Sequence, residues 1–248
     1  MQLACSTLTF GKTKTEKDFT DALDAVKSAG YRGVQIERDL LPDSLLQRPK
    51  EVRQLVTSAG LRTVAVAVTS DPYDIRFTDE VDGRIGTLCL FEKSFEEAAR
   101  QIRKLLRLSS KHGVNLAVHP HVRSNVETIQ SVEEILNLAP DDPNLSLVFD
   151  SAHFTALGWD VINFLRRFHK YVSIAHIKDL KRLKSPSKID YDRDFADIGD
   201  GIVDFKELMK EFKRIRFSGW LVVEVDHPQL RTPAASARRN YEKLSRLM

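Results

Sequence analysis

The sequence has too little of several features to belong to some common classes of protein. It contains two cysteines in 248 residues, and both Cys5 and Cys89 lie in short apolar runs, which predicts reduced core thiols and no disulfide framework. No apolar run approaches the ~18–20 residues that a membrane-spanning helix needs, and the first residues lack the basic start of a secretory signal. We therefore expect a cytoplasmic protein without a membrane anchor.

An excess of charge of one sign is also absent. The 38 Lys and Arg residues against 35 Asp and Glu residues leave a formal net charge of +3, which is too small to favour a nucleic-acid partner. No linker rich in Pro, Gly or Ser divides the chain. We therefore expect one domain over residues 1–248, a length typical of an eight-stranded α/β barrel, which has roughly 250 residues.

Short apolar runs alternate with segments of helical period along the whole chain, which indicates repeated βα units. The expected strands are Leu3–Leu8, Gly33–Glu37, Arg62–Val68, Thr87–Phe91, Val114–His119, Leu145–Asp150, Val172–His176 and Trp220–Val225. The expected helices are Glu16–Ser28, Ser44–Ala59, Ser94–Lys111, Val132–Leu138, Asp160–His169, Phe205–Arg214 and Pro233–Leu247. Eight strands in 248 residues give a period of 248/8, or 31 residues, which predicts a closed (β/α)₈ TIM barrel.

Two details qualify this barrel. The stretch 70–84 contains Asp71-Pro72 and Asp82-Gly83, which are turn formers, so we expect a loop or a degenerate or missing third helix there. An open doubly wound sheet is the alternative architecture. It receives little support as a dinucleotide-binding fold, since no GxGxxG pattern follows the first strand.

Ionisable residues stand at the ends of five expected strands, where the active site of such a barrel lies. They are Glu37, His119 with His121, Asp150, His176, and Glu224 with Asp226. A charged residue that ends an apolar strand is unlikely to be buried without a partner. For any one of them, a helix-capping Asp or a hydrogen-bonded core histidine is an equally good interpretation.

Together, two imidazoles and two carboxylates at one barrel mouth would suit a divalent metal ion. We assign His119, Asp150, His176 and Glu224 as its ligands, and leave open whether His119 or His121 serves from the fifth strand. A mixed nitrogen and oxygen set favours Mn²⁺, Co²⁺, Fe²⁺ or Zn²⁺ over Mg²⁺ or Ca²⁺, and we place Mn²⁺ first.

Further polar residues stand close to these positions in the sequence. His153 follows Asp150 in DSAHF, and Lys178 and Arg182 follow His176, so they predict a surrounding shell that binds substrate or moves protons. We count Asp226 among the substrate-binding candidates as well. The competing interpretation is a solvated basic loop over residues 181–188.

Four motifs resemble the sugar phosphate isomerase/epimerase family, whose members have a xylose isomerase-like barrel. They are VFDSAHFTALGWD (148–160), AHIKDL (175–180), DIGDGIVDF (197–205) and GWLVVEVD (219–226), and they occur in the family's order. The resemblance implies a Glu, an Asp, a His and a Glu as metal ligands, of which Asp150, His176 and Glu224 match. It also implies that His153 and Arg182 contact substrate hydroxyls.

The chain departs from this pattern on the fifth strand, where LAVHPHV places His119 at a position usually held by a carboxylate. Epimerases of the family use two ligand carboxylates to remove and return a proton, so this pair is broken here. The HPHV pattern and the ending VDHPQLRTPAASARRNYEKL more closely resemble inosose dehydratases. The available acids and bases are His119, His121, Glu37 and Lys178, with Glu224 as a ligand carboxylate near the substrate.

We therefore expect a metal-dependent enzyme that removes a proton next to the carbonyl of a sugar, keto-sugar or keto-cyclitol, with dehydration slightly favoured over isomerisation or epimerisation. The expected partners are this small molecule and, since barrel enzymes often dimerise, a second copy of the chain. Two other classes are less favoured. One is a non-catalytic barrel that only binds sugar or is a subunit of a larger complex. In such a protein, His119 in place of the usual carboxylate would mean that the catalytic activity has been lost. The other is an apurinic endonuclease, a class that shares the Asp-x-x-His pattern formed here by Asp150 and His153. This sequence lacks the additional histidines that such enzymes need to bind three zinc ions.

Overall fold

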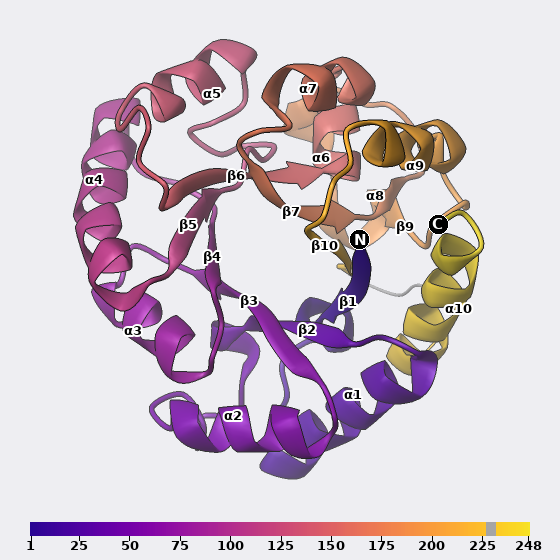
Figure 1. The fold of residues 1–248 in the computed structure, drawn as a ribbon. Coiled ribbons are helices and arrows are strands. Elements are labelled where there is room, and N and C mark those ends of the chain that lie inside the picture. The colour runs from indigo at the N-terminus through magenta and orange to yellow at the C-terminus, as the bar shows by residue number, and fades with distance from the viewer. Residues whose placement is uncertain (227–231) are drawn as a thin grey trace.

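In a computed structural model, which describes residues 1–226 and 232–248, eight parallel strands close into a barrel in the order β1-β10-β7-β6-β5-β4-β3-β2. The strands are β1 (Gln2–Ser6), β2 (Gly33–Glu37), β3 (Arg62–Val68), β4 (Ile85–Leu88), β5 (Asn115–Val118), β6 (Leu145–Asp150), β7 (Val172–Ile177) and β10 (Trp220–Val223). Figure 1 looks into this ring of strands with the helices around it. The predicted fold class is confirmed, while the centre of the VDHPQLRT motif, residues 227–231, lies outside the described residues.

The helices follow the strands along the chain and cover the outside of the barrel (Figure 1). They are α1 (Glu16–Ala29), α2 (Pro49–Ser58), α3 (Pro72–Glu80), α4 (Phe95–His112), α5 (Ile129–Leu136), α6 (Ser151–Ala156), α7 (Val161–Phe168), α8 (Tyr191–Asp194), α9 (Phe205–Arg214) and α10 (Pro233–Ser245). Among residues 1–226 and 232–248, no helix combines the length and the apolar character that crossing a membrane requires.

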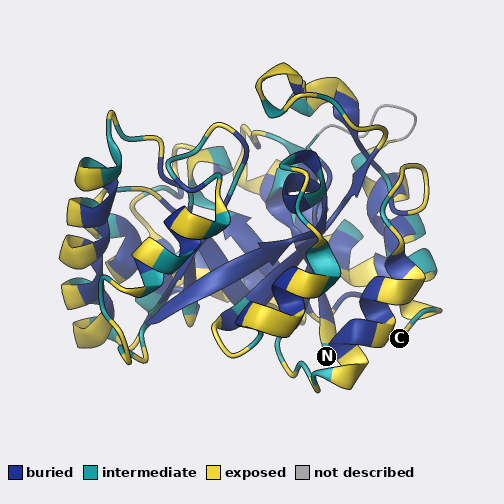
Figure 2. Ribbon diagram, turned by 90° about the horizontal axis from the view of Figure 1, so that it is seen from above, coloured by how far each residue is buried: buried dark blue, intermediate teal, exposed yellow. Residues whose placement is uncertain are grey.

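The main core lies between the strands and the inner faces of the helices, as Figure 2 shows by the buried strands and the exposed outer sides of the helices. Helix α4 illustrates the pattern: Ser94 caps its first turn, Gly113 ends it in a left-handed conformation, and Ile102 and Leu105 are buried. A separate, smaller cluster fills the barrel interior and contains strand residues such as Ala4, Ala117, Val148 and Val222. Side chains alternate between the two faces of a strand, so every second residue points into the barrel.

The stretch 70–84 contains the regular helix α3, which corrects the prediction of a loop or a degenerate or missing third helix there. Asp71 accepts a hydrogen bond from the backbone N–H of Tyr73, and Pro72 occupies the first turn. An Asp cap followed by Pro is a signal for the start of a helix as well as for a turn. Buried Ile75 and Phe77 then anchor the short helix to the core.

A short antiparallel hairpin of β8 (Asp179–Leu180) and β9 (Phe195–Ala196) follows β7, and helix α6 begins directly after β6. Neither element was predicted. The carboxylate of Asp179 accepts backbone hydrogen bonds from Gly199, Gly201 and Val203, so it holds the DIGDG motif against the AHIKDL motif. Asp179 therefore has a structural role in connecting these two segments.

Candidate metal centre

The predicted site residues lie at the C-terminal ends of neighbouring strands. His119 directly follows β5, Asp150 is the last residue of β6, His176 lies in β7, and Glu224 follows β10. The strand register aligns Asp150 with His176 and places Val222 on the other side of His176. Because parallel strands end at one face of the barrel, residues that are 26 to 105 positions apart meet there.

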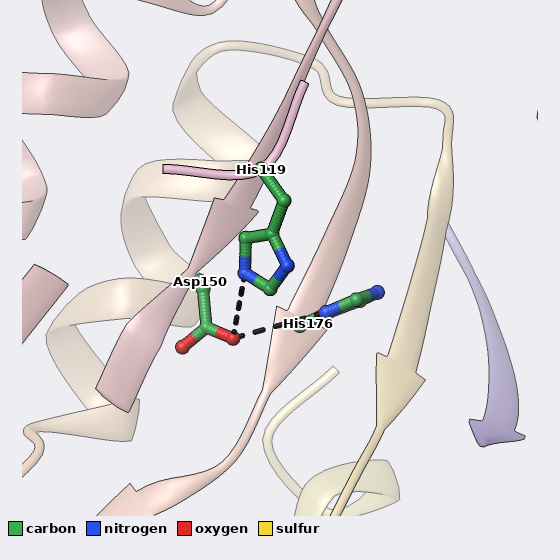
Figure 3. Close-up of side chains that lie close together, drawn as sticks. All are labelled: His119, Asp150 and His176. Carbon is green, nitrogen blue, oxygen red and sulfur yellow. Dashed lines mark ion pairs between the residues drawn. The ribbon is translucent and has the colours of Figure 1, made fainter. Parts of the chain in front are cut away.

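Three of these side chains form a compact cluster of possible ligand atoms, drawn in Figure 3. One atom each from His119, Asp150 and His176 lies within 4.8 Å of the other two, and all three residues are buried. Nε2 of His119 is 3.3 Å from Oδ2 of Asp150, and Nδ1 of His176 is 3.8 Å from the same oxygen. Between the fifth-strand histidines, it is therefore His119 that joins the cluster.

The other polar atom of each of these side chains already has an interaction partner in the protein. Oδ1 of Asp150 caps helix α6 by accepting the backbone N–H groups of Ala152 and His153. Nε2 of His176 lies 2.8 Å from Oε1 of Gln35, and Nδ1 of His119 lies 3.2 Å from Sγ of Cys89. The side chains are thereby held with their remaining ligand atoms facing one another.

Those remaining atoms are His119 Nε2, Asp150 Oδ2 and His176 Nδ1, and each is buried without a hydrogen-bond partner among the described residues. A buried polar atom left without a partner costs free energy, typically about 1–3 kcal/mol. Three such atoms within 4.8 Å of one another form the pattern expected of a metal centre. Two imidazoles and a carboxylate suit Mn²⁺, Co²⁺, Fe²⁺ or Zn²⁺.

Glu224, the fourth predicted ligand, lies at the edge of this cluster. Its Oε2 is 3.7 Å from Nδ1 of His176, while its Oε1 accepts a hydrogen bond of 2.5 Å from Nζ of Lys178. Lys178 Nζ is also 3.4 Å from Asp226 and 3.6 Å from Asp150. One carboxylate oxygen of Glu224 is thus paired with an ammonium group, and the other faces the cluster.

Lys178 is a buried cation held by carboxylates. Burial alone would lower its pKa, but Asp226, Glu224 and Asp150 raise it well above the ordinary value. The pKa of Asp226 is raised to about 6, mainly by burial, whereas Lys178 holds the pKa of Glu224 at about 2 against the effect of burial. At neutral pH Lys178 is therefore an ammonium group beside the carboxylates of Asp150, Glu224 and Asp226. It can exchange a proton with Asp226 more easily than with Glu224, because the pKa of Asp226 is the higher of the two.

A cavity of about 280 Å³ opens over the cluster. Its described lining includes His119, His176, Glu224, Asp226, Glu37, His121, Cys89 and Phe91. Glu37 accepts hydrogen bonds from Ser6 and Gln35 through one oxygen, Oε1. Burial and the charge of Glu224 nevertheless raise the pKa of Glu37 to about 7, so this carboxyl can take up or release a proton near neutral pH.

The structure places His121 and His153 in direct contact. Their rings lie 3.6 Å apart between centroids, with His121 at the cavity and His153 fully buried behind it. Nζ of Lys178 is 3.4 Å from Nε2 of His153. Burial lowers the pKa of both histidines, that of His121 to about 3, so both rings are neutral at pH 7. Among the described contacts, His153 reaches the cavity only through its neighbours.

Arg182 is the predicted site residue that the structure does not bring to the cluster. It lies exposed after β8 and interacts electrostatically with Asp194; among the described residues it contacts none of the cluster. Its predicted contact with substrate hydroxyls stays a prediction.

Two residues of the site were missed by the sequence analysis. Cys89 was expected in the core but lines the cavity beside His119, whereas Cys5 is buried as expected. Gln35 stands two residues before Glu37 in GVQIE, and strand alternation puts both on one face. That spacing was the available signal, but it does not distinguish a polar residue inside a barrel from one at its rim.

Comparison with known proteins finds relatives in sequence and in fold. A family model described as "Xylose isomerase-like TIM barrel" matches residues 81–247. An inosose dehydratase of Mesomycoplasma hyopneumoniae (strain J) is 26% identical over 167 residues, which cover 63% of this chain and 55% of that relative. The chain therefore spans little more than half the length of this curated relative.

Solved structures share the fold at low sequence identity. The probable 3-DHS dehydratase AsbF of Bacillus anthracis superposes with a TM-score of 0.83 at 14% identity, covering 99% of both chains. A structure of the IolI protein with a bound zinc atom has a TM-score of 0.77 at 19% identity and covers 100% of this chain and 96% of its own. At these identities the likeness concerns the fold.

Proposed function

Since this chain belongs to the xylose isomerase-like TIM-barrel family, we propose that it is an enzyme that depends on one divalent metal ion and removes a proton next to the carbonyl of a keto-sugar or keto-cyclitol. Dehydration is the outcome we favour. The observation that carries the proposal is the set of three buried ligand atoms on His119, Asp150 and His176, each without a hydrogen-bond partner in the part of the chain that the structure describes. The relatives named inosose dehydratase support the class of reaction.

The three residues would hold the metal ion, with Glu224 as a further ligand through its second oxygen. When bound, the ion would supply positive charge that polarises a substrate carbonyl and acidifies the neighbouring C–H group. Mn²⁺, Co²⁺, Fe²⁺ and Zn²⁺ all suit the mixed nitrogen and oxygen set, and we place Mn²⁺ first.

Glu37 is the base that we propose for the removal of this proton. It lines the cavity, and its pKa of about 7 is close to the optimum for a general base at neutral pH. Its Oε1 is held by Ser6 and Gln35, which leaves Oε2 to accept the proton. His121 also lines the cavity, but its pKa, lowered to about 3 by burial, makes it a weaker base than Glu37.

Lys178 is the acid that we propose for the departure of the β-hydroxyl. It is positively charged and linked to Asp226, which lines the cavity, so a proton can pass from the ammonium through that carboxyl. Asp226, which lines the cavity, would orient substrate hydroxyls, and the buried His153 would act on them only through His121. Loss of water then leaves an unsaturated ketone, and return of the proton elsewhere would give an isomer instead.

The cavity also indicates what kind of substrate it takes. Its described lining contains Glu37, Asp39, Glu224 and Asp226 but no Lys or Arg side chain. Carboxylates repel phosphate, and an Arg or Lys contact is the usual means of binding it. We therefore propose a neutral polyol ketone rather than a sugar phosphate.

The test compares wild type with His176→Ala and with the matched control His169→Ala, which changes a histidine at the end of α7. Metal content is measured by elemental analysis after dialysis. Turnover is measured by mass spectrometry on a panel of neutral keto-cyclitols, ketoses and ketose phosphates. We expect about one divalent ion per chain and loss of water from a keto-cyclitol in wild type and H169A, and neither in H176A.

Each other outcome contradicts part of the proposal. Retention of metal by H176A would contradict the ligand assignment. Wild type that holds metal but converts no member of the panel would indicate a sugar-binding barrel, and interconversion of ketoses without loss of water would indicate an isomerase. Preference for a ketose phosphate would contradict the neutral substrate.

A further inference from the structure

Gln35 lies inside the barrel and joins two parts of the site that are far apart in the sequence. It belongs to β2 and is 1% exposed. Its Oε1 is 2.8 Å from Nε2 of His176, and its Nε2 donates a hydrogen bond of 2.8 Å to Oε1 of Glu37. The hydroxyl of Ser6 donates a second hydrogen bond, of 2.9 Å, to the same oxygen of Glu37. The result is a continuous chain of polar contacts from Ser6 to His176.

The direction of this chain follows from the chemistry of its members. An ionised carboxylate only accepts hydrogen bonds, so the group of Gln35 that faces Glu37 must be the NH₂. The amide oxygen then faces His176, and because this oxygen only accepts, Nε2 of His176 must carry the hydrogen. A neutral imidazole has one N–H, which leaves a lone pair on Nδ1.

The reversed amide would have the opposite consequence. Its oxygen would lie 2.8 Å from an oxygen of Glu37, where two acceptors repel each other, and its NH₂ would face Nε2 of His176. The hydrogen of His176 would then sit on Nδ1 and point at the carboxylates of Asp150 and Glu224, which lie 3.8 and 3.7 Å away. A metal ion could not bind that nitrogen.

We propose that Gln35 is a positioning residue: oriented by Glu37, it holds His176 in the tautomer whose Nδ1 can bind a metal ion. The effect on metal binding rests on the proposed metal dependence of the enzyme. The tautomer of His176 itself is a property of the metal-free protein. Glu37 therefore has a second role besides proton transfer, because its carboxylate sets the direction of the Gln35 amide.

Gln35→Met tests this role, since Met has a similar length but can neither accept the hydrogen from His176 nor donate to Glu37. Gln35→Glu keeps an acceptor for His176. The matched control is Gln101→Met, the same change on helix α4, outside the site. Long-range ¹H–¹⁵N spectra of the metal-free proteins report the tautomer of His176, and competition with a chelator reports the affinity for Mn²⁺ and Zn²⁺.

We expect the Nε2–H tautomer in wild type, Q101M and Q35E, and a mixture of tautomers in Q35M. The affinity of Q35M for both ions should fall roughly 10- to 100-fold, as is usual when the outer partner of a ligating histidine is removed. Q101M should bind like wild type. If Q35M does not fold, Glu37→Leu removes the group that orients the amide and should likewise give mixed tautomers.

The outcomes separate this inference from the proposed function. Wild type that shows the Nε2–H tautomer but binds neither ion would overturn the metal dependence and leave the link from Gln35 to His176 standing. A Q35M protein with the wild-type tautomer and affinity would overturn the role of Gln35 while the metal centre stands. Wild-type protein with the hydrogen on Nδ1 of His176 would also overturn the proposed role of Gln35.

Discussion

At the scale of single residues, the site combines carboxyl groups with opposite shifts in pKa. Glu224 stays ionised because Lys178 offsets its burial, whereas Glu37 has a pKa raised to about 7 by burial and by Glu224. The two side chains face the same cavity. Different environments thus let one carboxylate remain a fixed charge while the other exchanges a proton.

This contrast predicts the pH dependence of the proposed reaction. A base acts only when ionised, and a pKa of about 7 leaves Glu37 protonated at lower pH, so kcat/KM should rise between about pH 6 and pH 8. The rise should be absent in Glu37→Gln, as measured by steady-state rates across this range. Asp39→Asn changes another carboxylate of the cavity and should keep the rise. A flat profile in wild type would contradict Glu37 as the base.

At the scale of secondary structure elements, helices α7 and α9 are joined by a charged cluster. Glu211 in α9 is buried and accepts hydrogen bonds from Arg166 of α7 and from Arg214 of its own helix. These contacts, chiefly the one with Arg214, lower the pKa of Glu211 to about 2. A carboxyl with a lowered pKa in the folded state stabilises the fold above its ordinary pKa near 4.5 and loses this contribution as the pH falls towards 2.

Glu211→Gln should therefore destabilise the protein at pH 7 by about 1 kcal/mol, a value kept small because both arginines are half-exposed and screened by solvent. Urea unfolding of wild type and variant at pH 7 and near pH 3 measures the difference in free energy of unfolding. The difference should narrow at the lower pH. A gap that stays constant would show that packing, and not charge, is the contribution of Glu211.

At the scale of the whole molecule, the candidate metal centre connects three adjacent strands, β5, β6 and β7, through His119 directly after β5, Asp150 in β6 and His176 in β7. Its ligands come together only in the folded barrel. A metal ion that binds the folded state alone shifts the folding equilibrium towards that state. The melting temperature therefore reports metal binding, and this measurement does not require the substrate.

Removal of divalent ions with a chelator should lower the melting temperature of wild type. With the ion at about 100 times its dissociation constant, the stabilisation is about 2.7 kcal/mol, which corresponds to roughly 5–10 °C for a chain of this size. Differential scanning calorimetry of wild type, His176→Ala and His169→Ala measures this shift. We expect it in wild type and H169A only, and an equal shift in H176A would place the metal elsewhere.

The order of apolar runs and helical segments was sufficient to predict the barrel, because a βα unit buries its strand in only a few ways and eight such units close into a ring. The same logic placed His119, Asp150, His176 and Glu224 at one face, since parallel strands end together. The sequence also indicated helix α3 through Asp71-Pro72, but the same two residues begin turns, so local pattern alone did not resolve it.

Which atoms meet was decided by the tertiary structure alone. The choice of His119 over His121 depends on where β5 ends against β6, and the pairing of Glu224 with Lys178 depends on β7 and β10 lying side by side. The role of Gln35 requires the barrel to close, because His176 is 141 residues away in the chain and reaches it only across the interior. A sequence specifies which groups are available at the strand ends, whereas distances of a few ångströms between them arise from packing and register.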